Sequence, residues 1–529
     1  MGRREDMFDS LVELITQDSL NGNNYDKLGD YYLEENKEKA YLCYENALFL
    51  GVTADEKVIK KMEMLEQEGI DKHKVSIIIL SYNAREMMID CIESIRRNNP
   101  VKSYELIVID NASTDGIVDW LKEQDDIVLR CNEENVGFPK GGNQGIELAE
   151  KDNDIMLLNN DTIVTENALF WLRMALCEPE VGASESISNM VEKLSSEGTG
   201  KEIRSKNEQL EFAVYNNVLL EYPYEMCLFL RGYALLFKRN VLKKIGNLDE
   251  RFSPGNFEDN DICFRILQEG YKLVMCYNSF IFHYGSASFN KKKEWYSDIY
   301  KNNYFQFNKK YGFDVDYYTR QRFDLIEHIQ KDISQNFKLL DIGCGCGSTM
   351  LRVEGLYPHA ETIGVEKCSK AVVIGSRVAE IYCLDIEKQE LPFEKQSFDY
   401  VFMGNVLEQL SNPHATLLNI KEYLKPSGLI IASVYNCANI KNIYGLLKGC
   451  YNTTERYGLW DEKNIHYFTG ESIMVLFQQC GYEIRDITYT ENVLSPEEEE
   501  VIKLTERMED RTSEELLRAY NYIVIAGRG

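Results

Sequence analysis

The feature that most constrains the fold is an apolar run that ends abruptly in polar residues. Residues 155–158 read Ile-Met-Leu-Leu, and Asn159, Asn160 and Asp161 follow at once. A buried strand of this kind delivers its polar residues to the lip of a sheet, where the ligands of open α/β folds bind. Taken alone, the triplet favours a simple turn, because Asn and Asp are good turn formers.

Three earlier segments repeat the same pattern. Apolar runs at residues 75–80, 105–109 and 127–130 each lead into a polar stretch, and helical patterns separate them. Alternating strands and helices predict a doubly wound sheet with a crevice above the carboxyl ends of its strands. We interpret that lip as a site for a metal and a diphosphate.

Taken in order, the polar stretches resemble the motifs of the family 2 glycosyltransferases, and they are closest to the rhamnosyltransferase-like branch. The motifs are Ser-Tyr-Asn at 81–83, Asp-Asn-Ala-Ser-Thr-Asp-Gly at 110–116, the glycine-rich stretch 135–145, Asn-Asn-Asp-Thr at 159–162, and the stretches 255–261 and 283–286. The resemblance covers about residues 74–310. It implies a GT-A fold and sugar transfer with inversion.

The same motifs predict where a nucleotide sugar binds. Asp110 can accept a hydrogen bond from a pyrimidine N–H, the glycine-rich loop lets the backbone approach the nucleotide closely, and Lys140 adds a positive charge. The expected nucleotide-sugar residues are Ser81, Asn83, Asp110, Gly137, Lys140, Asn143 and Asn160. The resemblance favours a dTDP-linked or UDP-linked donor.

A divalent metal is expected beside the diphosphate. Asp161 is the carboxylate of its triplet and is expected to hold Mg²⁺ or Mn²⁺, with His283 as a second ligand. A lone His at the end of an apolar run is equally typical of a capping or core residue. Asn159 stands where many relatives have a carboxylate, which predicts weaker metal binding.

A catalytic base is expected in the acidic run Glu-Asp-Asn-Asp at 258–261. The resemblance implies that Asp259 takes the proton of the acceptor hydroxyl as that hydroxyl attacks the sugar. The alternative is that the run caps the following helix, and both can hold at once. Acceptor recognition is expected in the polar, irregular segment 187–224, which includes 195–200.

A second series of motifs begins after about residue 318. A strand pattern at 338–342 runs into Gly-Cys-Gly-Cys-Gly at 343–347, and the next strand ends in Glu366. That spacing fits a nicotinamide site as well as an S-adenosylmethionine site.

Later motifs resemble the class I S-adenosylmethionine-dependent methyltransferases over about residues 321–529. They are Asp-Ile-Glu at 385–387, a strand at 398–403, Leu-Lys-Pro-Ser-Gly at 424–428, Asn-Ile-His-Tyr-Phe-Thr at 464–469 and a last strand at 520–526. By this resemblance Asp341 and three glycines line the methionine side, Glu366 holds the ribose and Asp385 contacts the adenine. The expected cofactor-binding residues are Asp341, Gly343, Gly345, Gly347, Glu366, Asp385 and Asn405.

The base of the methyl transfer is less well marked. Gln409 stands where relatives usually have His. His466 is then the candidate catalytic residue, and a purely structural His is the alternative.

Residues 7–70 show helical patterning without strand-like alternation, and part of it resembles one tetratricopeptide repeat. A single repeat cannot bury its own face, so these helices are expected to pack on the next domain or on a partner. A plain helical extension is the alternative. The predicted fold class is α/β, with two doubly wound Rossmann-like domains (GT-A glycosyltransferase, residues 73–318; class I methyltransferase, residues 319–529) preceded by a small α-helical segment (residues 1–72).

Composition narrows the function classes. The net charge of −27 opposes binding to nucleic acid, and fourteen Cys without a repeated spacing favour a cytoplasmic protein. No run approaches the roughly 18 apolar residues of a transmembrane segment, so any membrane contact is expected to be peripheral.

The expected function is that of a bifunctional enzyme. One half transfers rhamnose or another hexose to a glycan or glycoprotein acceptor, and the other methylates the glycan with S-adenosylmethionine, as in surface polysaccharide or flagellin glycan synthesis. Two alternatives stay open. The first is that only one half is catalytic and the other is a binding module. The second is that the methyltransferase acts on a protein or a lipid.

Overall fold

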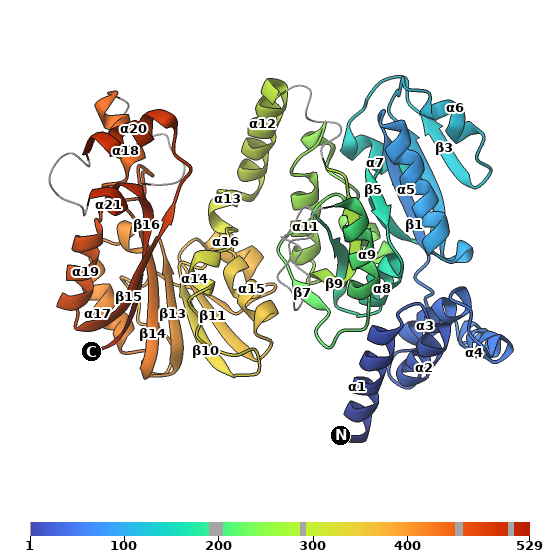
Figure 1. The fold of residues 1–529 in the computed structure, drawn as a ribbon, viewed down its shortest axis with the longest axis horizontal. Coiled ribbons are helices and arrows are strands. Elements are labelled where there is room, and N and C mark those ends of the chain that lie inside the picture. The colour runs from blue at the N-terminus through green and yellow to red at the C-terminus, as the bar shows by residue number, and fades with distance from the viewer. Residues whose placement is uncertain (1, 190–204, 286–292, 450–458, 506–512) are drawn as a thin grey trace. The chain divides into compact units, whose positions relative to one another are not determined.

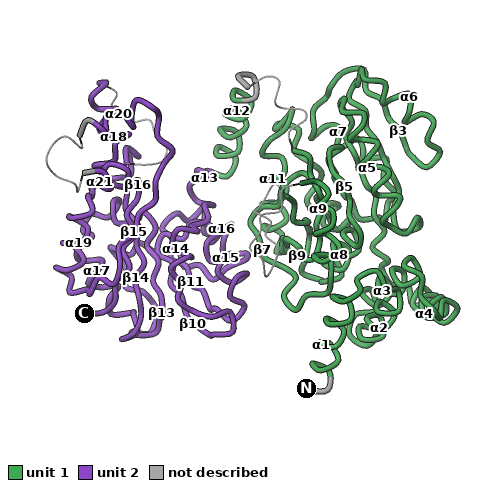
Figure 2. The backbone as a smooth tube through the Cα atoms, viewed as in Figure 1, with its two compact units in different colours: residues 1–311 green, residues 312–529 purple. Residues whose placement is uncertain are grey.

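The computed structural model describes residues 2–189, 205–285, 293–449, 459–505 and 513–529. The chain forms two compact units, Met1–Tyr311 and Gly312–Gly529 (Figures 1 and 2). Each unit is built on a mixed α/β sheet, and helices precede the first sheet, so the predicted fold class is confirmed. Within the described ranges, no helix is both long enough and apolar enough to cross a bilayer.

In the first unit the described strands form a nine-stranded sheet in the order β3-β2-β1-β4-β8-β6-β9-β5, with β7 paired to β9. The four strands β3, β2, β1 and β4 are parallel neighbours. The near-continuous apolar sequences of β1 and β4 suit strands that are covered on both faces, whereas β3 is the partly exposed edge strand. The strands are β1 (Val75–Ser81), β2 (Tyr104–Asp110), β3 (Ile127–Cys131), β4 (Asp154–Asn159), β5 (Thr162–Val164), β6 (Val181–Ile187), β7 (Tyr224–Met226), β8 (Ala234–Phe237) and β9 (Lys272–His283).

Helices cover both faces of this sheet. The helices that follow β1 in the unit are α5 (Arg85–Asn98), α6 (Ile117–Lys122), α7 (Phe138–Leu148), α8 (Ala168–Leu176), α9 (Lys206–Asn216), α10 (Arg239–Ile245), α11 (Glu258–Gln268) and α12 (Lys293–Tyr311), with the short 3₁₀ turns η1 (Val101–Ser103) and η2 (Glu250–Phe252). Ile77 and Ile79 of β1 pack into one core with α5 and α8, and the alternate residue Ile78 faces α7. A Cβ on Gly145 would clash with Ile78, so glycine allows α7 to lie directly on β1.

The N-terminal helices share a core with α8. They are α1 (Gly2–Gln17), α2 (Gly22–Tyr32), α3 (Lys37–Phe49) and α4 (Asp55–Gln67). All nine residues of α8 are buried, because its inner face packs on the sheet and Phe170 and Trp171 pack into the helical cluster around Tyr25. Eight of its nine residues are apolar, and the ninth, Arg173, is paired with Glu45, so the helix is covered on all sides. The expectation that the N-terminal helices pack on the next domain is confirmed.

In the second unit the described strands form a seven-stranded sheet in the order β12-β11-β10-β13-β14-β16-β15, in which β16 runs antiparallel to both neighbours. The strands are β10 (Phe337–Ile342), β11 (Ala360–Glu366), β12 (Ile381–Cys383), β13 (Phe398–Gly404), β14 (Leu424–Tyr435), β15 (Tyr482–Glu491) and β16 (Ala519–Arg528). The helices are α13 (Val315–Tyr318), α14 (Phe323–Ile326), α15 (Ser348–Leu356), α16 (Ser369–Gly375), α17 (Pro413–Lys421), α18 (Ile440–Leu447), α19 (Gly470–Gln479), α20 (Pro496–Thr505) and α21 (Ser513–Arg518), with the 3₁₀ turn η3 (Leu407–Gln409). Alternate residues of β10 enter two different cores, Leu340 on one face and Leu339 on the other.

Candidate functional site

The carboxyl ends of the parallel strands of the first sheet meet at one edge. The register pairs Ser81 with Asp110, and it pairs the neighbouring Leu80 with Asn159. Just beyond these ends, the amide Nδ2 of Asn160 donates to the carbonyl of Asn83 at 3.3 Å. The structure therefore brings Ser81, Asn83, Asp110 and Asn160 together, although they come from three segments of the chain.

One carboxylate oxygen of Asp110 accepts a hydrogen bond within the protein, and the other has no partner among the described residues. Its Oδ2 accepts from the backbone N–H of Ser113 at 2.9 Å, whereas the buried Oδ1 has no hydrogen-bond partner among the described residues. A buried polar atom without a partner is costly. An N–H group of a nucleotide base would satisfy it.

The glycine-rich loop leads into α7 beside this edge. Gly137 has a φ of 84°, and an added Cβ would lie 2.8 Å from the Cα of Pro254. Lys140 is exposed on the first turn of the helix. Asn143 uses its whole amide inside the protein, since it donates to the carbonyl of Leu248 at 3.0 Å and accepts from the backbone N–H of the same residue at 2.9 Å. Asn143 thus holds a neighbouring loop in place.

Asp161 and His283 lie side by side although 122 positions separate them in the sequence. Antiparallel pairing of β5 with β9 sets Thr162 opposite His283, and the His283 Nε2 lies 3.1 Å from the Asp161 Oδ1. The ring of Tyr233 stacks on the imidazole with 5.3 Å between the centroids. A carboxylate and an imidazole suit Mn²⁺, and with water and a diphosphate they could complete its coordination.

Asp259 joins this group through a short stretch of backbone. It lies in the first turn of α11, and its Oδ2 accepts from the backbone N–H of Gly232 at 3.2 Å. Gly232 is followed in the chain by Tyr233, whose ring stacks on His283. The backbone carbonyl of Tyr233 accepts a hydrogen bond from the backbone N–H of Asn159. Residues 232–233 therefore connect the candidate base with the candidate metal ligands.

The surroundings of Asp259 favour proton uptake. Burial raises the pKa of Asp259 above its ordinary value, and backbone N–H groups, including those of Asn260 and Gly232, oppose that rise. Burial, with the charge of Asp259 second, also raises the pKa of Glu258 well above its ordinary value. A carboxylate with a raised pKa is the stronger proton acceptor.

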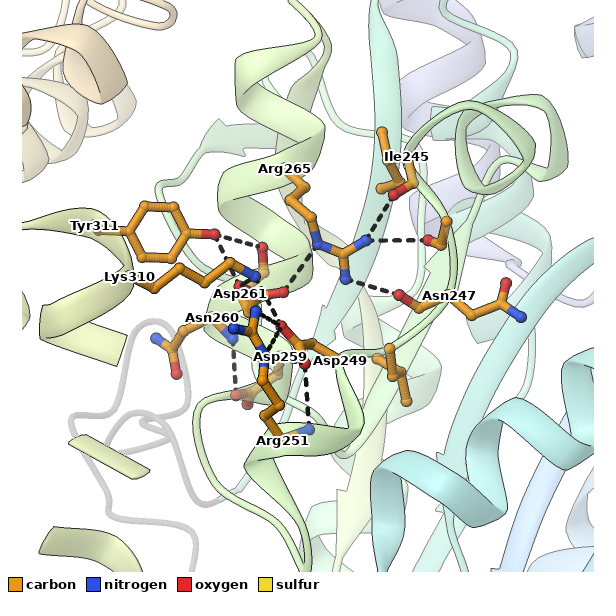
Figure 3. A network of polar contacts seen from close by, with 12 residues as sticks. Ile245, Asn247, Asp249, Arg251, Asp259, Asn260, Asp261, Arg265, Lys310 and Tyr311 are labelled. Atoms are coloured by element: carbon orange, nitrogen blue, oxygen red, sulfur yellow. Dashed lines mark hydrogen bonds and ion pairs between the residues drawn. The ribbon is translucent and has the colours of Figure 1, made fainter. Parts of the chain in front are cut away.

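Asp261 has a structural role two residues further on (Figure 3). Its carboxylate is fully buried and accepts from the Arg265 Nε at 2.9 Å and from the Tyr311 hydroxyl at 2.9 Å, and it also forms an ion pair with Lys310. Both Lys310 and Tyr311 belong to the last turn of α12. The acidic run is therefore divided, with Asp261 anchoring α12 to α11 and Asp259 facing Gly232.

The second unit has a cavity at the carboxyl ends of β10 and β13. Its lining includes four of the predicted cofactor residues, Asp341, Gly343, Gly345 and Asn405. The carboxyl group of Asp341 is buried, and burial raises its pKa to about 7. The positive charge of the nearby Arg322 lowers the pKa and so opposes that rise. An acidic group facing a cavity beside a glycine-rich turn fits a positively charged ligand.

Three other predicted cofactor residues are not among those lining the cavity. Glu366 is buried, and its two carboxylate oxygens accept from the backbone N–H groups of Gly345 at 3.1 Å and Cys368 at 2.7 Å. Gly347 is the N-cap residue of α15 and has a φ of 85°. Asp385 is partly exposed and forms an ion pair with Lys388 at 2.7 Å.

His466 is not brought to the cavity that Asp341 lines. Its ring lines a second cavity of about 340 Å³ together with His414, and its buried Nε2 has no hydrogen-bond partner within the part of the chain that the structure describes. Gln409 lies closer to the first cavity, because its Nε2 donates to the Tyr317 hydroxyl at 2.5 Å.

Sequence reasoning missed several residues at both places. Tyr317 and Arg322 line the cavity of the second unit, and the Arg322 Nη1 donates to the Asn405 Oδ1 at 2.9 Å. In the first unit, Tyr233 and the buried Glu185, whose Oε2 accepts from the backbone N–H of Arg231 at 2.8 Å, flank the candidate base. None of these residues belongs to a motif with a readable spacing. Of the predicted acceptor segment 187–224, residues 190–204 lie outside the described residues, and these include 195–200.

Two family models match the chain, one in each compact unit. Residues 76–235 match the family described as Glycosyl transferase family 2, and residues 315–487 match the family described as Methyltransferase domain. Ubiquinone biosynthesis O-methyltransferase of Cereibacter sphaeroides is 31% identical over 183 residues, which are 32% of this chain and 70% of that protein. Demethylmenaquinone methyltransferase of Staphylococcus saprophyticus is 28% identical over 150 residues, which are 26% of this chain and 62% of that protein.

Two solved structures are each similar to part of the chain. The mannosyltransferase PcManGT from Pyrobaculum calidifontis, in complex with GDP-Man and Mn²⁺, has 16% identity and a TM-score of 0.34 and covers 45% of this chain and 64% of its own. A SAM-dependent methyltransferase from Archaeoglobus fulgidus has 18% identity and a TM-score of 0.30 and covers 42% of this chain and 99% of its own. The two family matches lie on different units: the match to Glycosyl transferase family 2 falls in the first unit and the match to Methyltransferase domain falls in the second, so the chain belongs to the methyltransferase family through its second unit.

Proposed function

We propose that this chain is a bifunctional transferase. Its first unit transfers a sugar, rhamnose or another hexose, from a dTDP-linked or UDP-linked donor to a glycan or glycoprotein acceptor, with inversion. Its second unit methylates the glycan with S-adenosylmethionine. The observation that carries the proposal is the connection of Asp259 to the Asp161 and His283 pair through residues 232–233.

Different residues of the first unit have different roles in the proposed sugar transfer. The unpaired Oδ1 of Asp110 accepts a hydrogen bond from the base of the donor, and the backbone at Gly137 comes close to the nucleotide. Asp161 and His283 would hold Mg²⁺ or Mn²⁺. When bound, the ion neutralises charge on the leaving diphosphate. Asp259 takes the proton of the acceptor hydroxyl as that hydroxyl attacks the anomeric carbon.

Nucleotide release tests this proposal. A panel of UDP-, dTDP- and GDP-sugars with Mn²⁺ and mixed glycan acceptors is expected to give release of one nucleotide by the intact chain. Asp161→Ala is expected to abolish that release, because it removes the carboxylate that would hold the ion. Asp152→Ala is the matched control, since Asp152 is exposed and its ion pair with Lys243 lies at the surface. Release that is equal in wild type and Asp161→Ala would refute the metal assignment.

The second unit would bind the methyl donor at the cavity that Asp341 lines. S-adenosylmethionine supplies a methyl group on a positively charged sulfur. Asp341 balances the positive charge of the ligand, and the glycines at 343 and 345 let the backbone approach it. The name of the 31%-identical relative, an O-methyltransferase, supports a hydroxyl group as the methyl acceptor. A hydroxyl of the sugar product is the acceptor that the fusion of the two domains favours.

The affinity for S-adenosylmethionine is expected to rise with pH through about 7. Burial raises the pKa of Asp341 to about 7, so at pH 6 a cationic ligand must displace a proton, and at pH 8 it meets a carboxylate. One linked proton predicts binding about tenfold weaker at pH 6 than at pH 8. Calorimetric titration with S-adenosylmethionine at both values measures the difference. Asp341→Asn is expected to bind weakly and equally at both, and an equal affinity in the wild type would contradict the role of Asp341.

A further inference from the structure

A second group of potential metal ligands lies at the opposite end of β4 from Asp161. It contains a carboxylate oxygen of Glu38, a ring nitrogen of His73 and the Sγ of Cys177, and these three atoms lie within 4.8 Å of one another. Glu38 lies in the first turn of α3, His73 in the segment before β1, and Cys177 at the C-terminal cap of α8. The group therefore joins the N-terminal helices to the sheet. It is the one set of three such ligands within the described ranges.

The imidazole of His73 is oriented as in a metal site. Its Nδ1 lies 2.7 Å from the Asp154 Oδ2, which leaves Nε2 directed toward Glu38. Histidine ligands of metals commonly donate their other ring N–H to a carboxylate in this way, which fixes the tautomer and the ring orientation. The Asp154 carboxylate is itself held, because its Oδ1 accepts from the backbone N–H of Arg239 at 2.8 Å.

The separation of the ligand atoms also fits a metal. The His73 Nε2 lies 3.4 Å from the Glu38 Oε2, clearly longer than the 2.7 Å contact on the other side of the ring. Two ligands of a tetrahedral zinc ion, at bond lengths of about 2.0–2.1 Å, stand about 3.4 Å apart. Glu38 is thus placed at the distance of a neighbouring ligand.

The surroundings hold the group in place. His73 and Cys177 are each only 3% exposed, and His73 has a φ of 44°, in the left-handed region. The buried Arg173 fixes this backbone, since its Nε donates to the carbonyl of His73 at 2.8 Å and its Nη2 to that of Lys72 at 2.9 Å. Little reorganisation would be needed on binding.

We propose that Glu38, His73 and Cys177 bind a zinc ion, with water as the fourth ligand, and that the ion clamps the N-terminal helices to the sheet. Thiolate and imidazole together select zinc over Mg²⁺ or Ca²⁺. On binding, Cys177 loses its thiol proton to solvent, so one thiolate and one carboxylate balance the two positive charges. From Asp154 to Asn159, five residue steps of about 3.3 Å separate this site from the nucleotide edge by about 17 Å. The ion is therefore structural and takes no part in sugar transfer.

Cobalt substitution in the full-length chain tests the proposal. We use Co²⁺ alone as the probe, in the Asp161→Ala background, so that the candidate nucleotide site does not compete. Uptake of one Co²⁺ per chain is expected, with a thiolate-to-cobalt charge-transfer band in the near ultraviolet that added Zn²⁺ abolishes. Cys177→Ser is expected to lose the band. Cys263→Ser, which removes another buried thiol of the same unit, is expected to keep it.

A second variant keeps the test independent of folding. Glu38→Gln lies at a partly exposed position, so it is expected to fold, to keep the thiolate band and to bind Co²⁺ more weakly. Circular dichroism checks that each variant is folded. A folded Asp161→Ala chain that takes up no Co²⁺, or that binds it without a thiolate band, would overturn the proposal. A band that persists in Cys177→Ser would overturn it as well.

Discussion

Asp259→Asn is expected to lower the turnover of sugar transfer by about 10²–10⁴-fold, the usual contribution of a positioned general base. The amide keeps the shape of the carboxyl group but cannot take the proton of the acceptor hydroxyl. Its one amide oxygen can still accept from the backbone N–H of Gly232, although the variant loses the bond that the second carboxylate oxygen accepts from the backbone N–H of Asn260. Initial rates of nucleotide release with saturating donor and acceptor measure the effect.

The control for this variant lies at the other end of the same helix. Glu269→Gln also removes one negative charge, but the ion pair of Glu269 with Lys244 lies at the surface, so sugar transfer is expected to stay within about twofold of the wild type. If Asp259→Asn retains wild-type turnover, Asp259 is not the base. Unchanged methyl transfer in the same preparation would show that the second unit is intact.

Asp261→Asn is expected to destabilise the first unit by about 3–5 kcal/mol, the usual cost of removing one partner from a buried ion pair. Arg265 and Lys310 would lose their buried counter-charge, and the Tyr311 hydroxyl would lose its carboxylate acceptor. The attachment of α12 to α11 depends on these contacts (Figure 3). Loss of stability, with the chemistry of Asp259 unaltered, is the expected outcome.

Urea unfolding measures this effect. In a Trp460→Phe background the remaining tryptophans, at positions 120, 171 and 295, all belong to the first unit, so their fluorescence reports its free energy of unfolding. Glu180→Gln, which breaks a surface ion pair with Lys272, is the matched control and is expected to cost less than about 1 kcal/mol. Equal stabilities of the Asp261 and Glu180 variants would refute the anchoring role.

The sequence predicted best what depends on strand ends. Asp110 and Asn160 follow apolar runs of strand length, and parallel strands of a doubly wound sheet place such residues at a common edge. Asp161 and His283 could be paired in advance only through the family resemblance. No local pattern predicts that β5 lies against β9.

Other features could not be read from the chain because they depend on contacts between distant residues. The link from Asp259 through Gly232 to Tyr233 uses a backbone N–H, which every residue except proline carries. Tyr317 and Arg322 precede the first strand of their unit and reach its cavity only through the fold. Asn143 lies within a recognised motif, yet its amide is used to hold the loop at Leu248.

The complete burial of α8 has a consequence for how this protein can be divided. A truncation after residue 72 would remove the helices that cover Phe170, Trp171 and Met174. Part of the core would then become an exposed apolar surface that favours aggregation. The N-terminal helices are therefore no interchangeable accessory. In recombination between genes, or in the choice of fragments for expression, the N-terminal helices and the sheet must be kept together as one folding unit.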